Sequence, residues 1–229
     1  MPFSHETFAA KLGIMINEPK FFQEAITHRS YLNEHRSYEL SHNERLEFLG
    51  DAVLELVVTE YLYHEYTNPE GDLTSWRAAL VNGEMLAGIS KGLGVEEFLL
   101  MSKGEAKDLG RARQYLLANA MEAIIGALYL DQGYDAAKVF IMDNVVSHLP
   151  EVLKEGSYAD PKSRFQEIAQ EKVGLTPNYR VLRESGPDHD RHFVSGIYLG
   201  EELVAEGEGK SKQEAQREAA KNGLIAKGW

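Results

Sequence analysis

The spacing of hydrophobic residues divides the chain into two parts with different expected folds. Over residues 3–153, apolar residues recur every three or four positions, which is the period of an amphipathic α-helix. Beyond residue 158, three segments are typical of β-strands separated by Gly-containing turns, and they cover residues 178–184, 192–199 and 202–206. Helical patterns flank the strands over 161–172 and from 211 to about 227. The sequence therefore predicts an all-α domain followed by a small α+β domain of order α-β-β-β-α.

Turn and linker residues give the boundaries of these parts. We expect the helical domain to occupy residues 1–153, a linker to occupy 154–158 and the second domain to occupy 159–229. Within the helical domain, apolar periodicity predicts helices over 73–88, 116–131 and 135–149. The last of these is expected to stop at Pro150, because proline breaks a helix interior. Residues 104–110, bounded by glycines, are expected to form a loop.

Three acidic residues share one face of a helix predicted to begin after Ser41. Glu44, Glu47 and Asp51 are spaced i, i+3 and i+7, so their carboxylates stack on one side and repel one another. A bound cation would remove that repulsion, and hard carboxylate oxygens suit Mg²⁺ or Mn²⁺. The apolar residues of this segment are expected to pack into a core, and they are Leu46, Phe48, Leu49, Val53 and Leu54.

The same stripe also has a purely structural interpretation. Ser41 and Glu44 match a capping box, in which the glutamate only completes the start of the helix. Arg45 could neutralise one carboxylate in an ordinary ion pair. Spacing alone leaves the structural and the metal-binding interpretations equally open.

A second polar pair strengthens the metal hypothesis. Asn119 and Glu122 interrupt a strongly apolar helix, where an unpaired carboxylate is costly. Gly50 and Gly126 each fall in a helix interior and would let two helices approach closely. We therefore expect the helices to cross and to gather four side chains around one cation, namely Glu47, Asp51, Asn119 and Glu122.

Composition and charge restrict the remaining function classes. The 229 residues contain no cysteine, which excludes disulfides, thiolate metal sites and cysteine nucleophiles. The amino-terminal residues lack the pattern of a signal peptide and no stretch is long and apolar enough to cross a bilayer, so we expect a cytoplasmic protein without a membrane partner. The net charge is −12, but residues 158–229 hold 11 Lys and Arg against 12 Asp and Glu. Residues 1–157 therefore carry almost all of the negative charge, and this part would need metal ions or a helper domain to meet a polyanion.

Residues 42–54, HNERLEFLGDAVL, resemble the signature of the ribonuclease III family. The segments THRSY at 27–31, EGDLT at 70–74 and LANAMEA at 117–123 resemble further blocks of that family in the same order. The resemblance implies that Glu47, Asp51 and Glu122 are metal-binding residues of a nuclease centre. It also implies that Glu44 contributes to substrate positioning and to the geometry of the dimer interface, and that Glu70 lies near the active-site valley with a less certain role. Asn119 departs from the family pattern, because many members carry Asp there, and its amide oxygen can still bind Mg²⁺ with one negative charge fewer.

The second domain resembles a double-stranded RNA-binding domain. The resemblance rests on three segments in order, DPKSRFQE at 160–167, GPDHDRHF at 186–193 and GEGKSKQEA at 207–215. Lys210 and Lys212 flank the start of a helix predicted from the capping pair Ser211 and Glu214, where free N–H groups favour phosphate. The other expected RNA contacts are Gln166 and Gln170 to ribose 2′-hydroxyls and His189 to a neighbouring minor groove. Each of these side chains alone could equally be an ordinary surface group.

The combined resemblance implies a Mg²⁺-dependent endoribonuclease that cleaves double-stranded RNA, in which Mn²⁺ could substitute. The family implies a homodimer, 5′-phosphate products, short 3′ overhangs and a role in processing rRNA and mRNA precursors, without a nucleotide cofactor. Phe48 and its neighbours are a candidate part of the dimer interface. For His28, His35 and His42 we expect structural roles in place of general-base roles. The alternatives are a non-cleaving double-stranded RNA-binding regulator, if Asn119 disables the metal site, and a structural component of a ribonucleoprotein.

Overall fold

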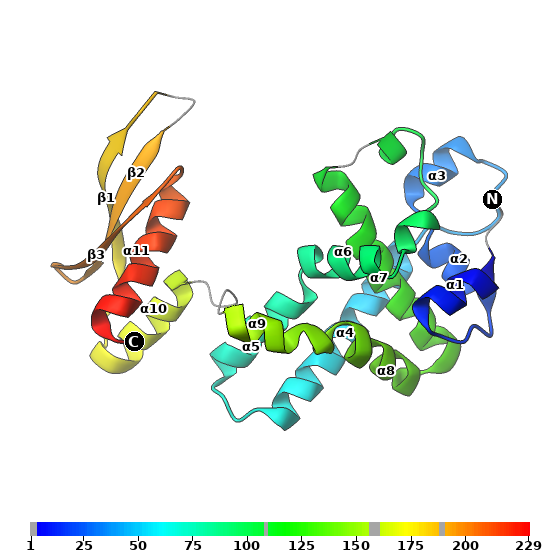
Figure 1. Ribbon diagram of the computed structural model, residues 1–229, viewed down its shortest axis with the longest axis horizontal. Helices are drawn as coiled ribbons and strands as arrows, with labels where there is room; N and C mark the ends of the chain where they lie inside the picture. The colour runs from blue at the N-terminus through cyan, green and yellow to red at the C-terminus, as the bar shows by residue number, and fades with distance from the viewer. Residues whose placement is uncertain (1–3, 108–109, 156–160, 188–190) are drawn as a thin grey trace. The chain divides into compact units, whose positions relative to one another are not determined.

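The chain forms two compact units, residues 1–158 and 159–229, and each is described by itself. A computed structural model describes residues 4–107, 110–155, 161–187 and 191–229 (Figure 1). The linker expected at 154–158 falls largely outside the described residues. No helix in the described part of the chain is long and apolar enough to cross a membrane.

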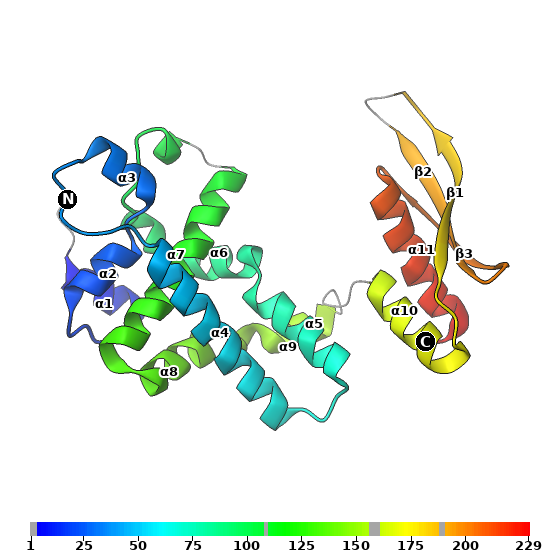
Figure 2. The same ribbon diagram turned by 180° about the vertical axis from the view of Figure 1, so that it is seen from behind.

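The first unit is helical, and two long helices, α4 and α7, form its centre (Figures 1 and 2). Its α-helices are α1 (His5–Leu12), α2 (Pro19–Ala25), α3 (Arg29–Glu34), α4 (Glu44–Glu65), α5 (Glu70–Val81), α6 (Gly83–Gly92), α7 (Arg111–Gln132), α8 (Tyr134–Asn144) and α9 (Leu149–Glu155). Short 3₁₀ turns are η1 (Val95–Glu97), η2 (Glu105–Lys107) and η3 (Val146–His148). The segment of α7 from Leu116 to Leu128 is buried apart from Asn119 and Glu122, which are only partly exposed. The polar pair singled out in the sequence therefore lies inside an apolar helix, as expected.

Two local predictions in this unit are wrong. The helix predicted over 73–88 is two helices, because Asn82 adopts an extended backbone and its side chain accepts a hydrogen bond from Met85 N at 2.9 Å to begin α6. Pro150 does not end the helical region. It lies in the first turn of α9, where its missing N–H would have no helical partner anyway. The segment 104–110 was expected to be a loop, and its described residues contain only the short η2 turn.

The start of α4 also differs from the expected capping box. Asn43, not Ser41, precedes the helix, and it is only 3% exposed. Its side-chain amide donates to Ala25 O at 3.2 Å, while its backbone N–H donates to Thr27 O at 2.9 Å. The start of α4 is therefore fixed by long-range contacts that no local pattern reveals. Phe48 was expected in the core, but its ring is on the surface and the residue is 81% exposed.

The second unit has the predicted order α-β-β-β-α. It contains α10 (Pro161–Val173), β1 (Asn178–Ser185), β2 (His192–Leu199), β3 (Glu202–Gly209) and α11 (Lys212–Lys227). The antiparallel sheet has the order β1-β2-β3, and both helices lie against one of its faces (Figures 1 and 2). Gly207 brings β3 against α11, because a Cβ there would lie 2.0 Å from Ala219 N. A small core closes this unit, formed by Phe165, Ala169, Ile197, Leu199, Ala219 and Ala220.

Candidate functional site

The two central helices cross with their backbones in contact. A Cβ on Gly50 would lie 1.7 Å from the carbonyl oxygen of Glu122 and 2.8 Å from the backbone nitrogen of Gly126. A Cβ on Gly126 would lie 2.3 Å from the carbonyl oxygen of Leu46. No side chain larger than hydrogen fits at either point, so the close crossing expected from the two glycines is confirmed.

This crossing brings the acidic side chains of α4 next to the polar pair of α7. The Asn119 side chain lies close enough to the Glu47 carboxylate to lower its pKa. Burial raises the pKa of Glu122 to about 7, and the negative charges of Asp51 and Glu47 add to that rise. Burial and the nearby charge of Glu44 also raise the pKa of Glu47, while the neighbouring Asn119 amide opposes this change. The structure therefore gathers the four expected side chains into one electrostatically coupled group.

All the donors of this group are oxygens, namely three carboxylates and one amide, which suits Mg²⁺ or Mn²⁺. Within the described residues, however, no three Asp, Glu or His side chains already form a metal cage. Binding of a cation would therefore have to draw these carboxylates closer together. The raised pKa values of Glu47 and Glu122 agree with such a site, because mutual repulsion in a partly buried place is what a cation would relieve.

Glu44 lies at the start of the acidic stripe and contacts basic groups from outside α4. Arg29 Nη1 is 3.5 Å from Glu44 Oε1, and His42 Nδ1 is 3.8 Å from Glu44 Oε2. The partner of this carboxylate is thus Arg29, and among the described residues Glu44 forms no ion pair with Arg45, the neighbour considered from sequence. That contact depends on the placement of α3 against the start of α4, which sequence spacing does not show.

The other histidines singled out in the sequence have structural contacts. The His28 side chain begins α3 by accepting a hydrogen bond from Ser30 N at 3.3 Å, and burial lowers its pKa. The His35 ring stacks on Tyr31 with centroids 3.9 Å apart. These contacts agree with the structural roles expected for both.

Glu70 is not brought to the acidic group within one chain. It begins α5, just after the far end of α4, and accepts a hydrogen bond from Thr74 Oγ1 at 2.8 Å. Glu47 lies 18 residues before Glu65, the last residue of α4, which is about 27 Å along a helix axis.

In the second unit, the expected RNA-contacting residues that are described all lie on the surface. Gln166 and Gln170 are exposed on α10, and Gln170 Nε2 donates to Thr176 Oγ1 at 3.2 Å. Lys210 and Lys212 are exposed beside the start of α11. His189 lies outside the described residues.

The predicted capping pair at the start of α11 is confirmed with one difference. Ser211 Oγ accepts from Glu214 N at 3.1 Å, as a capping residue does. Glu214 Oε2 accepts from Lys210 N at 2.7 Å, one residue before the position expected for a capping box. Both contacts fix the start of α11 next to two lysines.

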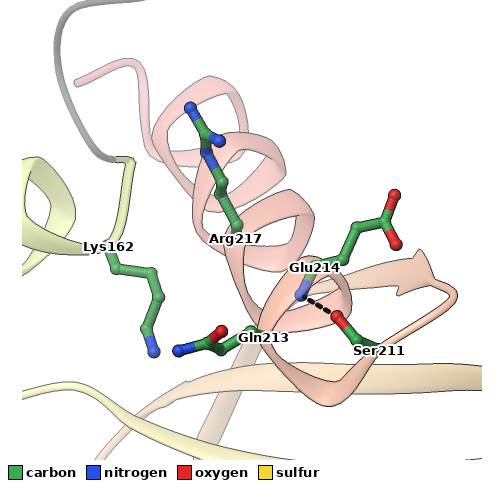
Figure 3. A pocket seen from close by; sticks show the side chains of 5 residues that line it. All are labelled: Lys162, Ser211, Gln213, Glu214 and Arg217. Atoms are coloured by element: carbon green, nitrogen blue, oxygen red, sulfur yellow. Dashed lines mark hydrogen bonds between the residues drawn. The ribbon is translucent and has the colours of Figure 1, made fainter. Parts of the chain in front are cut away.

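A hollow of about 480 Å³ adjoins this helix start, and sequence reasoning missed two of its basic residues. Figure 3 shows Lys162 of α10 and Gln213 and Arg217 of α11 around it. Lys162 Nζ donates to Gln216 Oε1 at 2.8 Å and lies 4.8 Å from the centroid of the Tyr179 ring. The position of Lys162 directly after Pro161, in a first helical turn, was the available sequence signal.

Comparison with known proteins agrees with this arrangement. Residues 18–149 match the family model described as Ribonuclease-III-like, and residues 161–226 match the double-stranded RNA binding motif. The chain is 44% identical over 218 residues to Ribonuclease 3 of Enterococcus faecalis, covering 93% of both chains. The chain belongs to the ribonuclease III family.

Further relatives support the same conclusion. Ribonuclease 3 of Oceanobacillus iheyensis is 43% identical over 217 residues, with 93% of each chain covered. Among solved structures, a nuclease domain of ribonuclease III from Campylobacter jejuni matches with a TM-score of 0.58 and 38% identity, covering 64% of this chain and 99% of that one. This ribonuclease III family member is therefore an endoribonuclease of that type, with a helical nuclease domain and a double-stranded RNA-binding domain.

Proposed function

We propose that this ribonuclease III family member is a Mg²⁺-dependent endoribonuclease that cuts double-stranded RNA, leaving 5′-phosphates and short 3′ overhangs. The observation that carries the proposal is the crossing of α4 and α7 at Gly50 and Gly126, which couples Glu47 and Asp51 to Glu122. Its natural substrates would be rRNA and mRNA precursors in the cytoplasm.

In this proposal Glu47, Asp51, Asn119 and Glu122 hold the metal. Bound Mg²⁺ would supply an activated water and would stabilise negative charge on the phosphate. The protein contributes position and proton affinity. The Asn119 amide lies beside the Glu47 carboxylate and lowers its pKa, and the glycine crossing holds the two helices at a fixed separation. Glu122, with a pKa of about 7, can hold or release a proton near neutral pH until a cation replaces that proton.

Duplex recognition is assigned to the second domain. Lys210 and Lys212 would contact phosphates at the capped start of α11, where the helix dipole also favours negative charge. Gln166 and Gln170 would contact ribose 2′-hydroxyls in the minor groove, and we keep His189 as a proposed contact. Such contacts read the shape of an A-form duplex more than its sequence.

A homodimer would give the enzyme one centre for each strand. On α4, Phe48, Leu56 and Tyr63 are 81%, 57% and 73% exposed and are spaced i, i+8 and i+15, so they share one side of the helix. An exposed apolar stripe of this kind marks a binding surface, and a two-fold dimer matches the approximate symmetry of a duplex. The structure from Campylobacter jejuni is described as flexible in a region involved in dimer formation, which supports a dimer here by similarity. A monomer in sedimentation at micromolar concentration would contradict this part of the proposal.

The test is cleavage of end-labelled duplex RNA in Mg²⁺, Mn²⁺ and EDTA. We expect the unaltered chain to cut only with metal, and Glu122→Gln to bind the duplex without cutting it. Asn119→Asp is the informative comparison, because it restores the charge that the family pattern carries. Binding without cleavage by the unaltered chain, with cleavage by Asn119→Asp, would instead favour the non-cleaving regulator.

A further inference from the structure

We propose that Arg29 positions the RNA in the nuclease centre by binding a backbone phosphate next to the one that is cut. This inference rests on the proposed function. It assigns a phosphate-binding role to a residue of α3, outside both long helices. The chemical partner is a single non-scissile phosphate of the duplex.

The Arg29 guanidinium lies beside the acidic stripe of α4. Its Nη1 lies 3.5 Å from Glu44 Oε1, and Glu44 stands three residues before Glu47 on the same face of α4. Three residues of helix correspond to about 4.5 Å along the axis. A guanidinium at that distance can hold one phosphate while the acidic group faces its neighbour.

Most of this guanidinium remains available to bind a phosphate. The Arg29 side chain is 69% exposed, and among the described residues its contact to Glu44 uses Nη1 alone. An exposed ion pair at this distance adds little to stability, so stability alone does not account for the arrangement. The planar guanidinium has five N–H donors in a fork that matches phosphate oxygens.

The backbone around Arg29 is fixed to the start of α4. His28 N donates to Leu100 O at 2.8 Å, and Asn43 N donates to Thr27 O at 2.9 Å. Asn43 is the residue that immediately precedes α4. Because the backbone of this segment is held in this way, little backbone entropy is lost when Arg29 binds the substrate.

The negative charge of the first domain also favours a basic residue at this place. Residues 1–157 hold most of the net charge of −12, so RNA approaching the acidic stripe meets repulsion. Metal ions relieve that repulsion only where they bind. Arg29 supplies a positive charge directly beside the acidic stripe of α4, and its ion pair with Glu44 would orient the guanidinium toward that stripe.

The experiment measures how kcat/KM for a fixed duplex depends on salt, for the unaltered full-length protein, Arg29→Ala and Arg29→Lys. Each phosphate contact contributes about 0.7–0.9 to the slope of log(kcat/KM) against log[salt]. We expect Arg29→Ala to reduce the slope by about that amount and to raise KM about tenfold, with kcat changed less. Arg29→Lys should restore the slope and part of KM, because a lysine keeps the charge and loses the fork.

Two further variants separate this role from a structural one. Lys20→Ala is a control that removes an exposed positive charge away from the acidic group. The nearby residues Asn17 and Glu18 donate backbone hydrogen bonds to Asp131. Asp131 follows Glu122 by nine residues, which is about 14 Å along α7. This control should leave the slope unchanged. Glu44→Gln breaks the ion pair but keeps the Arg29 charge, so it should keep the slope that Arg29→Ala loses. Thermal unfolding of each variant checks that the protein remains folded.

The outcomes distinguish the inference from the function on which it rests. An unchanged slope in Arg29→Ala, or an equal loss in Lys20→Ala, would overturn the role of Arg29 while cleavage by the unaltered protein still supports the nuclease. Glu44→Gln reproducing the full effect of Arg29→Ala would show that the ion pair matters, not a phosphate contact. Absence of metal-dependent cleavage by the unaltered protein would overturn both proposals.

Discussion

Replacing Gly50 by alanine should separate the two central helices and disable the nuclease centre. The new Cβ would lie 1.7 Å from the Glu122 carbonyl oxygen, whereas ordinary contacts begin at 3.4 Å. Neither atom can move alone, because the oxygen belongs to the backbone of α7 and the Cβ to that of α4. The helices must therefore move apart by roughly 1.7 Å, the difference between those two distances, with side chains of this densely packed core shifting accordingly.

The expected magnitude follows from two opposing effects. Alanine in a helix interior is favoured over glycine by about 1 kcal/mol. Overpacking a core costs about 1–3 kcal/mol, and occasionally more, and a backbone contact of this kind belongs at the upper end. The net destabilisation should be on the order of 2 kcal/mol, which lowers the melting temperature of a domain of this size by roughly 4–8 °C. A displacement of about 1 Å at a catalytic centre can cost roughly 100-fold in rate.

Gly88→Ala is the matched control for this experiment. Gly88 also lies inside a helix, α6, but nothing lies within 4 Å of a Cβ placed there. The same substitution should therefore stabilise the protein by up to about 1 kcal/mol and leave cleavage unchanged. Thermal unfolding followed by circular dichroism, and cleavage of a labelled duplex in Mg²⁺, give the two readouts for both variants.

The two variants differ in the sign of the expected change in melting temperature. We expect the melting temperature to fall in Gly50→Ala and to rise in Gly88→Ala. A Gly50→Ala protein that is as stable and as active as Gly88→Ala would refute the backbone crossing as the feature that assembles the centre. Full stability with lost activity would show that the helices can separate at no energetic cost, which would contradict the tight packing inferred at this point.

Four further predictions concern single residues. In EDTA at pH 8, Glu122→Gln should be more stable than the unaltered protein by on the order of 1 kcal/mol, a figure reduced for the partial exposure of the carboxyl. The pKa of Glu122 is about 7 in the folded state and 4.5 in the unfolded state, so ionisation of this group destabilises the native state. The difference in stability, measured by urea unfolding, should therefore shrink as the pH falls from 7 toward 4.5. Asn119→Asp should bind Mg²⁺ about tenfold more tightly in calorimetry and be less stable in EDTA, because it adds a fourth negative charge; equal affinities would contradict its place in the site. Phe48→Asp should dissociate a dimer into monomers in sedimentation, and an unchanged dimer would exclude this surface. Ser211→Ala should lose about 1 kcal/mol of stability in the second domain, measured by urea unfolding, because Glu214 N loses its acceptor.

Features that depend on local periodicity were predictable from the sequence. The helical first domain and the α-β-β-β-α order of the second follow from the spacing of apolar residues, and β2 has the predicted limits, His192–Leu199. The pair Ser211 and Glu214 begins α11 because a capping interaction involves neighbours within one turn. The shared face of Glu44, Glu47 and Asp51 likewise follows from helix geometry alone.

Other local predictions failed because distant contacts outweighed weak local preferences. Ser41 does not cap α4, since the buried Asn43 bonds to the 25–27 segment and places the start of the helix. Asn82 divides the helix predicted over 73–88, although the apolar period continues through it. Phe48 has the sequence context of a core residue, yet it lies exposed on the surface of α4. Propensities of a few tenths of a kcal/mol per residue do not decide such cases.

The fold class, the two domains and the acidic residues of the proposed metal site could be predicted from the sequence. Which of those residues lie next to one another depended on how the helices pack. The crossing at Gly50 and Gly126 sets Glu122 beside Asp51, and that proximity with burial raises the pKa of Glu122 to about 7. The contact of Arg29 with Glu44 and the separation of Glu70 from the acidic group were settled in the same way. The physical reason is that helix spacing repeats locally along the chain, whereas the approach of two helices depends on the packing of the whole core.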